Sequence, residues 1–347
     1  MTMMLQSPAF ELFWRSKTGT LRLESPGRSL SGVLGVEVVR QGRVVRLTTA
    51  DVSHVSVETD TGRDAHGPID VLKINYQETQ ALLLSIEIRL YPTRPFALMR
   101  VKVINKGPGA VKLRRFFFQT LPHTLEPAAE PTGFYSNGWQ SWSPAGFHPA
   151  EGRDFGMPLP LRPFTGPMMH NSESARQRGK GRFLSETVGA LVTLEDALVA
   201  GGASLADQFV QVSADLRPGN LGLTLQSQGD GVPLVAGEAR FSEWFYLEWV
   251  PLPNRDPLAQ YAYAVARQMG VSPLRSAPSG WSSWYIFWAD VKESQVVQNL
   301  ASAAMVCGEL PLDVIQLDQG FESRWGDWTE RNEDFPHSLG WLAERID

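Results

Sequence analysis

Apolar and polar residues alternate along many short segments of residues 1–250. In residues 84–90, leucine and isoleucine alternate with serine, glutamate and arginine, and Pro92 ends the pattern. A period of two is typical of β-strands with one buried face, and the Gly, Pro and Asn residues between the segments favour turns. The pattern predicts a mainly β fold: a large antiparallel β-sandwich, or supersandwich, over residues 1–250. Similar segments lie at residues 36–47, 101–103, 113–118, 209–212 and 241–249.

A linker helix is predicted within residues 251–278. Asp256 is a good N-cap, and Pro257 is tolerated at the first helical position. Gly270 suits the C-terminal end of the helix. The apolar face of this helix would consist of Leu258, Tyr261, Val265 and Met269.

Residues 279–347 show a strand, helix, strand order. Two apolar runs, residues 281–287 and 312–317, predict parallel β-strands, and we expect the second to be mostly buried. Asp290 and Glu293 resemble a capping box for the helix between them. The buried stripe of that helix is predicted as Val297, Leu300, Ala301 and Ala304. Ser338 is expected to cap a last helix that carries Leu339, Leu342 and Ile346.

Aromatic and polar side chains follow both of these predicted strands. Tyr285 and Trp288 lie at the end of the first apolar run, whereas Asp318, Gln319 and Trp328 follow the second strand. Consecutive parallel strands end at one edge of a sheet, and α/β barrels carry their active sites there. The spacing therefore predicts a binding site at this edge.

Residues 132–146 depart from the alternating pattern and predict a loop. Asn137 and Gly138 suit a tight turn, and Trp139 and Trp142 flank an amide and a hydroxyl. Indole faces stack well on the C–H face of a sugar, so the loop is a candidate sugar contact. The alternative, which spacing alone favours, is a loop held in place by two buried tryptophans. Residues 152–181 predict a second long loop.

The composition argues against several classes of function. The net charge of −5 comes without a long basic block, which argues against nucleic acid as a partner. No apolar run approaches the roughly 18 residues of a membrane span. The six histidines lack metal-ligand spacing, so we expect no metal and no cofactor.

Cys307 is the single cysteine and excludes an intrachain disulfide. We expect a buried, inert thiol on the helix that follows the first α/β strand. The first residues lack a basic region and a long apolar region, so no signal peptide is predicted. A cytoplasmic location is the resulting expectation.

Four sequence blocks carry a family resemblance. FYSNGWQSWS starts at Phe134, and SGWSSWYIFWADV, LPLDVIQLDQGF and GDWTERNEDFP follow, ending at Pro336. In order and spacing the set resembles glycoside hydrolase family 36, the α-galactosidase or melibiase family. The resemblance implies that residues 279–347 form the first two strands and helices of a truncated (β/α)8 catalytic barrel.

The resemblance also implies sugar-binding roles. Members of this family place an Asp-Asp pair after the second barrel strand; Asp318 matches its first position, and Gln319 stands at the second. An amide keeps an acceptor, gains two donors and loses the charge. Tyr285 and Trp328 match positions that line the sugar pocket. The tryptophans of residues 132–146 match the β-domain loop that reaches the barrel mouth.

The chemistry implied by the resemblance is retaining hydrolysis of terminal α-galactosides, with two carboxylates about 5–5.5 Å apart. In this family both are aspartates on later barrel strands, so we expect them beyond residue 347 and assign no catalytic residue here. We expect the 347-residue chain alone to be inactive. A substitute pair drawn from Asp318, Glu322, Asp327 and Glu330 is less favoured, because the resemblance makes Asp318 a binding group.

Two other interpretations are a non-catalytic galactoside-binding β-sandwich module and an inactive remnant that oligomerises through the sandwich. The expected ligand is a galactose-containing oligosaccharide or glycoside, and a homo-oligomer fits the family.

Two parallel strands leave an open edge. We therefore expect residues after about 279 to be ordered only when docked on the β-domain or on another polypeptide.

Overall fold

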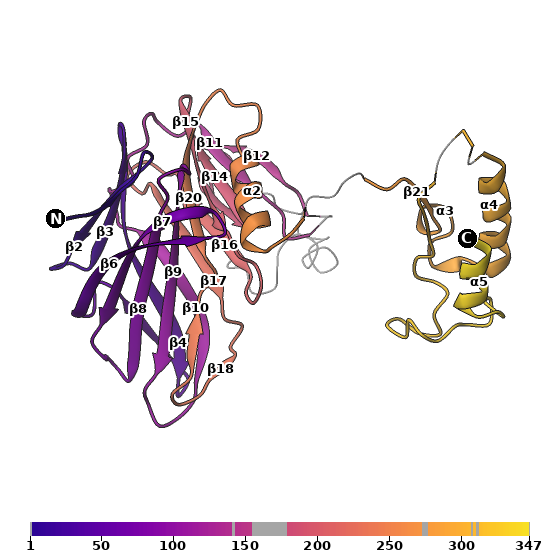
Figure 1. Ribbon diagram of the computed structural model, residues 1–347, viewed down its shortest axis with the longest axis horizontal. Coiled ribbons are helices and arrows are strands. Elements are labelled where there is room, and N and C mark those ends of the chain that lie inside the picture. The colour runs from indigo at the N-terminus through magenta and orange to yellow at the C-terminus, as the bar shows by residue number, and fades with distance from the viewer. Residues whose placement is uncertain are drawn as a thin grey trace. The chain divides into compact units, whose positions relative to one another are not determined.

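The computed structural model describes residues 2–140, 143–154, 179–272, 277–306, 308–309 and 312–346 (Figure 1). Cys307 and Trp142, together with most of the second predicted loop, lie outside the described residues. The chain divides into two compact units, Met1–Val271 and Ser272–Asp347. Each unit is described by itself.

The first unit contains two large antiparallel sheets. In the first sheet the described strands run in the order β1-β2-β3-β4-β10-β17-β16-β13, with β5 on β4 and β18 on β10. Their bounds are β1 (Thr2–Gln6), β2 (Glu11–Arg15), β3 (Thr20–Ser25), β4 (Arg28–Arg40), β5 (Arg43–Thr48), β10 (Val111–Thr120), β13 (Arg182–Glu186), β16 (Val210–Asp215), β17 (Gly222–Gln228) and β18 (Pro233–Leu234).

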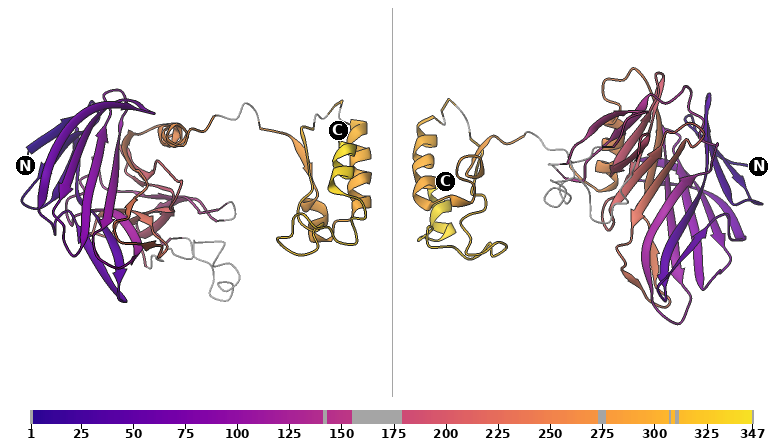
Figure 2. Two further views of the ribbon diagram at one scale, coloured as in Figure 1. Left: turned by 60° about the horizontal axis from the view of Figure 1, so that its bottom comes forward. Right: turned by 180° about the vertical axis from the view of Figure 1, so that it is seen from behind.

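The second sheet lies against the first (Figure 2). Its described strands run in the order β12-β11-β14-β15-β20-β9-β8-β7-β6, with β19 on β9. Their bounds are β6 (His54–Asp64), β7 (Gly67–Tyr76), β8 (Leu82–Leu90), β9 (Phe96–Asn105), β11 (Gly133–Ser136), β12 (Gly146–Pro149), β14 (Val188–Val192), β15 (Asp196–Gly202), β19 (Ala239–Phe241) and β20 (Phe245–Pro251). The predicted mainly β sandwich is confirmed.

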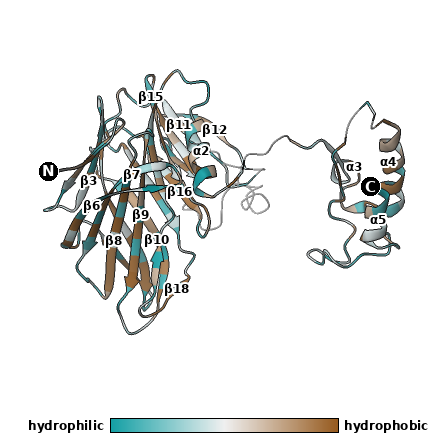
Figure 3. Cartoon of the chain, viewed as in Figure 1, coloured by the Kyte–Doolittle hydropathy of each residue, from teal (hydrophilic) through white to brown (hydrophobic). Residues whose placement is uncertain are grey.

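The alternating sequence explains why the two sheets pack face to face. Buried and half-buried residues alternate along the whole of β8, and hydrophobic and hydrophilic stretches alternate along the sandwich strands (Figure 3). One side of each sheet therefore contributes to a shared core, which includes Val36, Ile86, Phe116 and Leu225. Burial of such apolar faces is the main force that holds two sheets together.

The second sheet is also covered on its other side. A second buried cluster joins Tyr246 of β20 to Tyr261 and Ala264 of helix α2 (Ala259–Gln268). The two tyrosine rings meet edge to face at 5.2 Å, and the Tyr261 hydroxyl donates to the Gly202 carbonyl at 2.7 Å. With both faces covered, β15 is buried along its whole length and β20 along all of it except Pro251.

Helix α2 begins later than predicted. Leu258, not Asp256, is the N-cap residue, and no side-chain cap hydrogen bond is formed there. The backbone carbonyl of Asp256 instead accepts from the Ala259 N–H at 3.2 Å. Gly270, with φ of +65°, adopts the left-handed backbone expected just beyond a helix end.

The second unit has a short parallel sheet and three α-helices among its described residues. Strands β21 (Gly280–Ser282) and β22 (Val314–Gln316) pair in parallel, as predicted. The helices are α3 (Trp284–Phe287), α4 (Glu293–Val306) and α5 (Leu339–Ile346), with a 3-10 turn η2 (Trp288–Asp290) after α3. A small core joins the helices to the loop after β22 and consists of Val291, Val296, Phe321, Phe335 and Leu342.

Several predictions for this unit were wrong in detail. The first predicted strand ends at Ser282, because residues 284–287 form α3. The second predicted strand is not buried; Val314 is 44% exposed. On α4, Val296 rather than the predicted alanines is buried. The cap at Ser338 is confirmed, since its hydroxyl accepts from the Trp341 N–H at 3.0 Å.

The cap of α4 is built differently from the predicted box. The Gln295 side chain accepts from the Lys292 N–H at 2.8 Å. Gln295, rather than Glu293, therefore makes the capping-box hydrogen bond to the backbone N–H of the residue before the helix. Glu293 instead accepts from the backbone and the ring of His337, at 2.9 and 2.7 Å. Burial alone raises the pKa of the Glu293 carboxyl, but these two hydrogen bonds hold it below its usual value. This pairing ties the start of α4 to the start of α5.

Among the described residues, no helix combines the length and the hydropathy that crossing a bilayer requires.

Candidate functional site

The ends of β21 and β22 are locked to each other. Ser283 directly follows β21 and is fully buried. Its hydroxyl accepts from the backbone N–H of Asp318 at 2.9 Å, and its own N–H donates to the Gln316 carbonyl at 3.1 Å. The parallel register, with Ser282 opposite Gln316, brings these groups together. No role was predicted for Ser283 from the sequence. Its position directly after the first strand could have indicated one.

Asp318 therefore stands at a fixed place on the carboxyl edge of the sheet. Its carboxylate accepts from the Gln316 side chain at 3.0 Å and from the Gln319 N–H at 2.8 Å. Both Asp318 and Gln319 are half-buried. Within the described part of the chain, the Gln319 side chain makes no hydrogen bond, so its acceptor and two donors are open to a ligand.

The loop after β22 is shaped by Gly320. Its φ is +113°, and a Cβ there would lie 2.6 Å from the Ala289 carbonyl oxygen. Glu322, which is buried, accepts from the Gly320 N–H at 2.7 Å, and Asn332 donates to the Gly320 carbonyl at 2.7 Å. The loop thus packs directly on the turn after α3. Glu322 thus holds the backbone of this loop in place.

Exposed aromatic rings lie in the same unit. Tyr285 is 84% exposed on α3, so it extends from a helix and not from the predicted strand. Trp288 is also exposed, with its ring 5.5 Å from that of Trp284. Trp328 is 55% exposed and lies 6.2 Å from the Phe321 ring, which anchors one side of it. Large exposed apolar rings beside polar groups are typical of ligand contacts.

The tryptophan loop of the first unit is shorter than predicted. Residues 133–136 form β11, which pairs with β12 and β14, so the loop proper lies between β11 and β12. Asn137 anchors it by accepting from the Glu186 N–H at 3.0 Å and donating to the Glu186 carbonyl at 3.1 Å. A Cβ on Gly138 would lie 2.4 Å from that of Ser143.

Trp139 is half-buried in this loop. Its indole nitrogen is shielded from solvent and has no hydrogen-bond partner in the described part of the chain. The ring is thus partly packed, as the structural alternative predicts, and partly available to a ligand.

His148 of β12 lies beneath the same loop region. Its ring contacts the Ser136 hydroxyl at 2.8 Å, and burial lowers the pKa of its imidazole. The described residues include no cluster of His, Cys, Asp and Glu side chains suited to holding a metal ion.

Comparison with solved structures identifies the fold. AgaB, an α-galactosidase of glycoside hydrolase family 36 from Geobacillus stearothermophilus, matches 96% of this chain and 55% of its own at a TM-score of 0.56 and 12% identity. The galactosidase domain of the α-galactosidase-sucrose kinase AgaSK matches 98% of this chain at a TM-score of 0.57, also at 12% identity. The chain has the fold of the family 36 α-galactosidases.

Other α-galactosidases of known structure agree. The enzyme from Lactobacillus brevis matches 90% of this chain and 42% of its own, at a TM-score of 0.57 and 12% identity. The match to AgaSK covers 55% of that structure, so the chain spans about half the length of the α-galactosidases it matches. No protein-family model matches the chain. The predicted resemblance to family 36 is confirmed at the level of fold.

Proposed function

We propose that this chain supplies the sugar-binding part of an α-galactosidase-like retaining glycoside hydrolase that acts on terminal α-galactosides. One arrangement carries the proposal: Asp318 and Gln319 are fixed at the carboxyl edge of the parallel strands by the hydroxyl of Ser283. Polar groups at this edge are where barrel enzymes hold their substrates.

The side chains at this edge suit a sugar. The Asp318 carboxylate is an acceptor for sugar hydroxyl groups, while the Gln319 amide both donates and accepts. A carboxylate makes stronger hydrogen bonds than a neutral group, so Asp318 supplies most of the affinity and Gln319 adjusts specificity. The exposed rings of Tyr285 and Trp328 offer flat apolar faces to the C–H side of the sugar.

In this proposal the chain's own carboxylates bind and support rather than cleave. Retaining hydrolysis needs a nucleophile and an acid/base about 5–5.5 Å apart. Asp318 already accepts from a backbone N–H and a glutamine amide, and Glu322 is buried against Gly320. We therefore expect no hydrolysis of an aryl α-galactoside by the purified 347-residue chain. Robust turnover that is abolished by Asp318→Ala would overturn this division of roles.

Galactose binding tests the proposal directly. Titration of the whole chain with galactose, followed by tryptophan fluorescence or NMR, is expected to saturate. Asp318→Ala should weaken it by about tenfold, the factor typical of a lost charge-assisted hydrogen bond. The control is Glu344→Ala, which removes an exposed carboxylate from α5 and should leave binding unchanged. Equal affinity in Asp318→Ala and wild type would refute the assignment.

A second candidate function is a non-catalytic galactoside-binding module. The half-buried ring of Trp139 favours it, because the accessible part of an indole face can stack on the C–H side of a sugar. Binding lost in Trp139→Ala but kept in Asp318→Ala would support this module. A cytoplasmic location and a homo-oligomeric state complete the proposal; sedimentation of the purified chain tests the latter.

A further inference from the structure

The outward face of the first sheet carries a chain of side-chain hydrogen bonds across five neighbouring strands. Arg115 of β10 donates twice to Glu37 of β4, at 2.9 and 2.7 Å, and once to Gln226 of β17, at 2.6 Å. Gln226 donates to Gln211 of β16 at 2.6 Å, and Gln211 donates to Glu186 of β13 at 2.8 Å. These five residues are called the amide chain below.

The strand pattern places the amide chain opposite the core. The adjacent residues Val36, Phe116, Val212 and Leu225 all belong to the core between the sheets. Because successive side chains on a strand point to opposite faces, the members of the amide chain point outward. Gln211, Gln226 and Glu37 are nevertheless buried. A row of buried amides on an outward face is unusual for a solvated sheet surface, where polar side chains are normally exposed.

The direction of every hydrogen bond in the amide chain is fixed. Arg115 can only donate, so the Gln226 oxygen must face it and the Gln226 nitrogen must face Gln211. The Gln211 oxygen accepts that bond, and its nitrogen faces the Glu186 carboxylate. Burial alone raises the pKa of the Glu37 carboxyl, but the Arg115 hydrogen bond and the nearby arginine charges hold it below its usual value.

Gln228 joins this ordered chain from the side. Its nitrogen donates to the same Gln211 oxygen at 2.7 Å, and the reverse orientation would place two oxygens in contact. Its own side-chain oxygen is therefore the free end. Gln228 is only 5% exposed, and this oxygen has no partner in the described part of the chain. A buried acceptor without a donor costs stability, and Gln228 is one of several described residues with such an atom.

Gln228 lines an open cleft of about 360 Å³. Lys112, Arg114 and Arg115 bring donors to this cleft, and Asp230 brings a carboxylate. Phe209, which is 49% exposed, lies beside Gln228 across the strand pair, because the Gln228 N–H donates to the Phe209 carbonyl at 2.9 Å. The cleft therefore brings several donors and a carboxylate together directly over the buried Gln228 oxygen. The exposed Phe209 ring does not line the cleft but lies on the same face of the sheet, beside Gln228.

This combination selects a class of ligand. A simple anion has no donor for the Gln228 oxygen, and an apolar ligand would leave all the polar groups unsatisfied. A sugar offers hydroxyl groups that both donate and accept, together with a C–H face for an aromatic ring. The three basic residues of the cleft are offset by Asp230, which also lines it, and by Glu37, which pairs with Arg114 and Arg115, so only one net positive charge remains.

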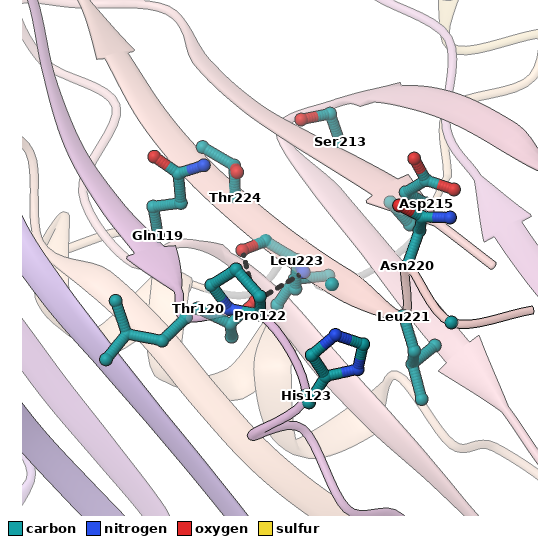
Figure 4. A pocket seen from close by; sticks show the side chains of 14 residues that line it. Gln119, Thr120, Pro122, His123, Ser213, Asp215, Asn220, Leu221, Leu223 and Thr224 are labelled. Atoms are coloured by element: carbon teal, nitrogen blue, oxygen red, sulfur yellow. Dashed lines mark hydrogen bonds between the residues drawn. The ribbon is translucent and has the colours of Figure 1, made fainter. Parts of the chain in front are cut away.

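We propose that this outward face, centred on Gln228, is a second saccharide-binding site that takes a neutral oligosaccharide. The face continues along β17 from Gln228 through Gln226 to Thr224, a span of about 14 Å. There it meets a hollow of about 290 Å³, lined by Gln119 of β10, Ser213 of β16 and His123 (Figure 4). The site does not depend on the proposed function, because no residue of the second unit takes part.

Sugar binding by the full chain tests the site with two neutral trisaccharides, raffinose and maltotriose. The measurement is NMR or calorimetric titration in an Asp318→Ala, Trp139→Ala background, which removes the other candidate contacts. Saturable binding of at least one trisaccharide is expected there. Phe209→Ala and Gln228→Leu, each added alone, should weaken it about fivefold or more, the factor expected for one neutral hydrogen bond or ring contact.

The matched control is Phe241→Ala, since Phe241 of β19 is a similarly exposed phenylalanine, 43%, on the second sheet. It should leave the affinity unchanged. Phe209 is exposed, so its variant stays informative if the buried Gln228→Leu variant fails to fold. Absence of binding in the background variant, or unchanged affinity in Phe209→Ala, would overturn the second site. Binding lost with Asp318→Ala alone would reject this site while supporting the proposed function.

Discussion

The hydroxyl of Ser283 accepts a 2.9 Å hydrogen bond from the backbone N–H of Asp318. The first residue follows β21 and the second follows β22, so this contact sets the relative position of two loops that are remote in sequence. A serine hydroxyl can accept here without losing its own proton. The position of the Asp318 carboxylate thus depends on a residue that need not touch a ligand at all.

Ser283→Ala should destabilise the second unit by about 0.5–1.5 kcal/mol, because the half-buried Asp318 N–H would lose its acceptor. Galactose affinity should also fall, since the carboxylate loses its fixed position. Hydrogen exchange of the Asp318 and Gln319 amides measures the first effect. Ser294 is one of two exposed serines on α4 and provides a control, since Ser294→Ala should alter neither quantity. Unchanged exchange at Asp318 in Ser283→Ala would contradict this account.

Gly320 and Gly326 form a matched pair for a second prediction. Both have positive φ, +113° and +99°, so an alanine at either position is strained by about 1–3 kcal/mol. Only at Gly320 would the new Cβ meet an atom, the Ala289 oxygen at 2.6 Å, whereas nothing lies within 4 Å of the Gly326 position. Gly320→Ala should therefore destabilise the second unit more, and weaken galactose binding more, than Gly326→Ala. Equal effects would show that the loop does not depend on this close approach.

The sandwich could be predicted because its signal is local. The alternation within a strand such as β8 shows which of its sides is buried. The order of the strands could not be predicted, because neighbours such as β4 and β10 are far apart in the sequence. Residues 241–249 were predicted to alternate like β8, but β20 is buried on both faces because α2 covers the second one. That cover is a tertiary contact, which explains why a sequence pattern alone does not foresee it.

The candidate site could be predicted only in part. The sequence placed Asp318 and Gln319 at a strand end correctly, because an apolar run followed by polar residues defines that end. It did not foresee that residues 284–287 form a helix, since the aromatic run there has neither a clear strand nor a clear helix period. The pairing of Glu293 with His337 joins positions far apart in the chain, so no local capping rule could reveal it.

Glu248 of β20 gives a pH-dependent prediction for the sandwich. Burial raises the pKa of its carboxyl from 4.5 to about 7, and the Tyr246 hydroxyl donates to it at 2.5 Å. A folded-state pKa above the unfolded value favours the protonated form. The resulting stability is fully present below pH 4.5 and is lost as the pH rises through about 7.

Glu248→Gln removes this titration and should make the sandwich more stable than wild type above pH 7, by on the order of 3 kcal/mol. At pH 4.5 the two proteins should differ little. Urea unfolding at both pH values measures the difference. Glu58→Gln, at an exposed position on β6, is the control and should show no such divergence. If the unfolding free energies of wild type and Glu248→Gln changed equally between the two pH values, the raised pKa of Glu248 would be ruled out.

The second unit should be far less protected from hydrogen exchange than the sandwich. Its described core has only five fully buried apolar residues, and each of its two paired strands has three residues. Two such strands leave open edges, and Val314 is exposed on one of them. We expect amides of β21, α4 and β22 to exchange at least about tenfold faster than those of β8 and β9 in the same molecules. A covering polypeptide should slow them selectively. Strong protection throughout residues 281–317 in a monomer would show instead that this unit is stable by itself.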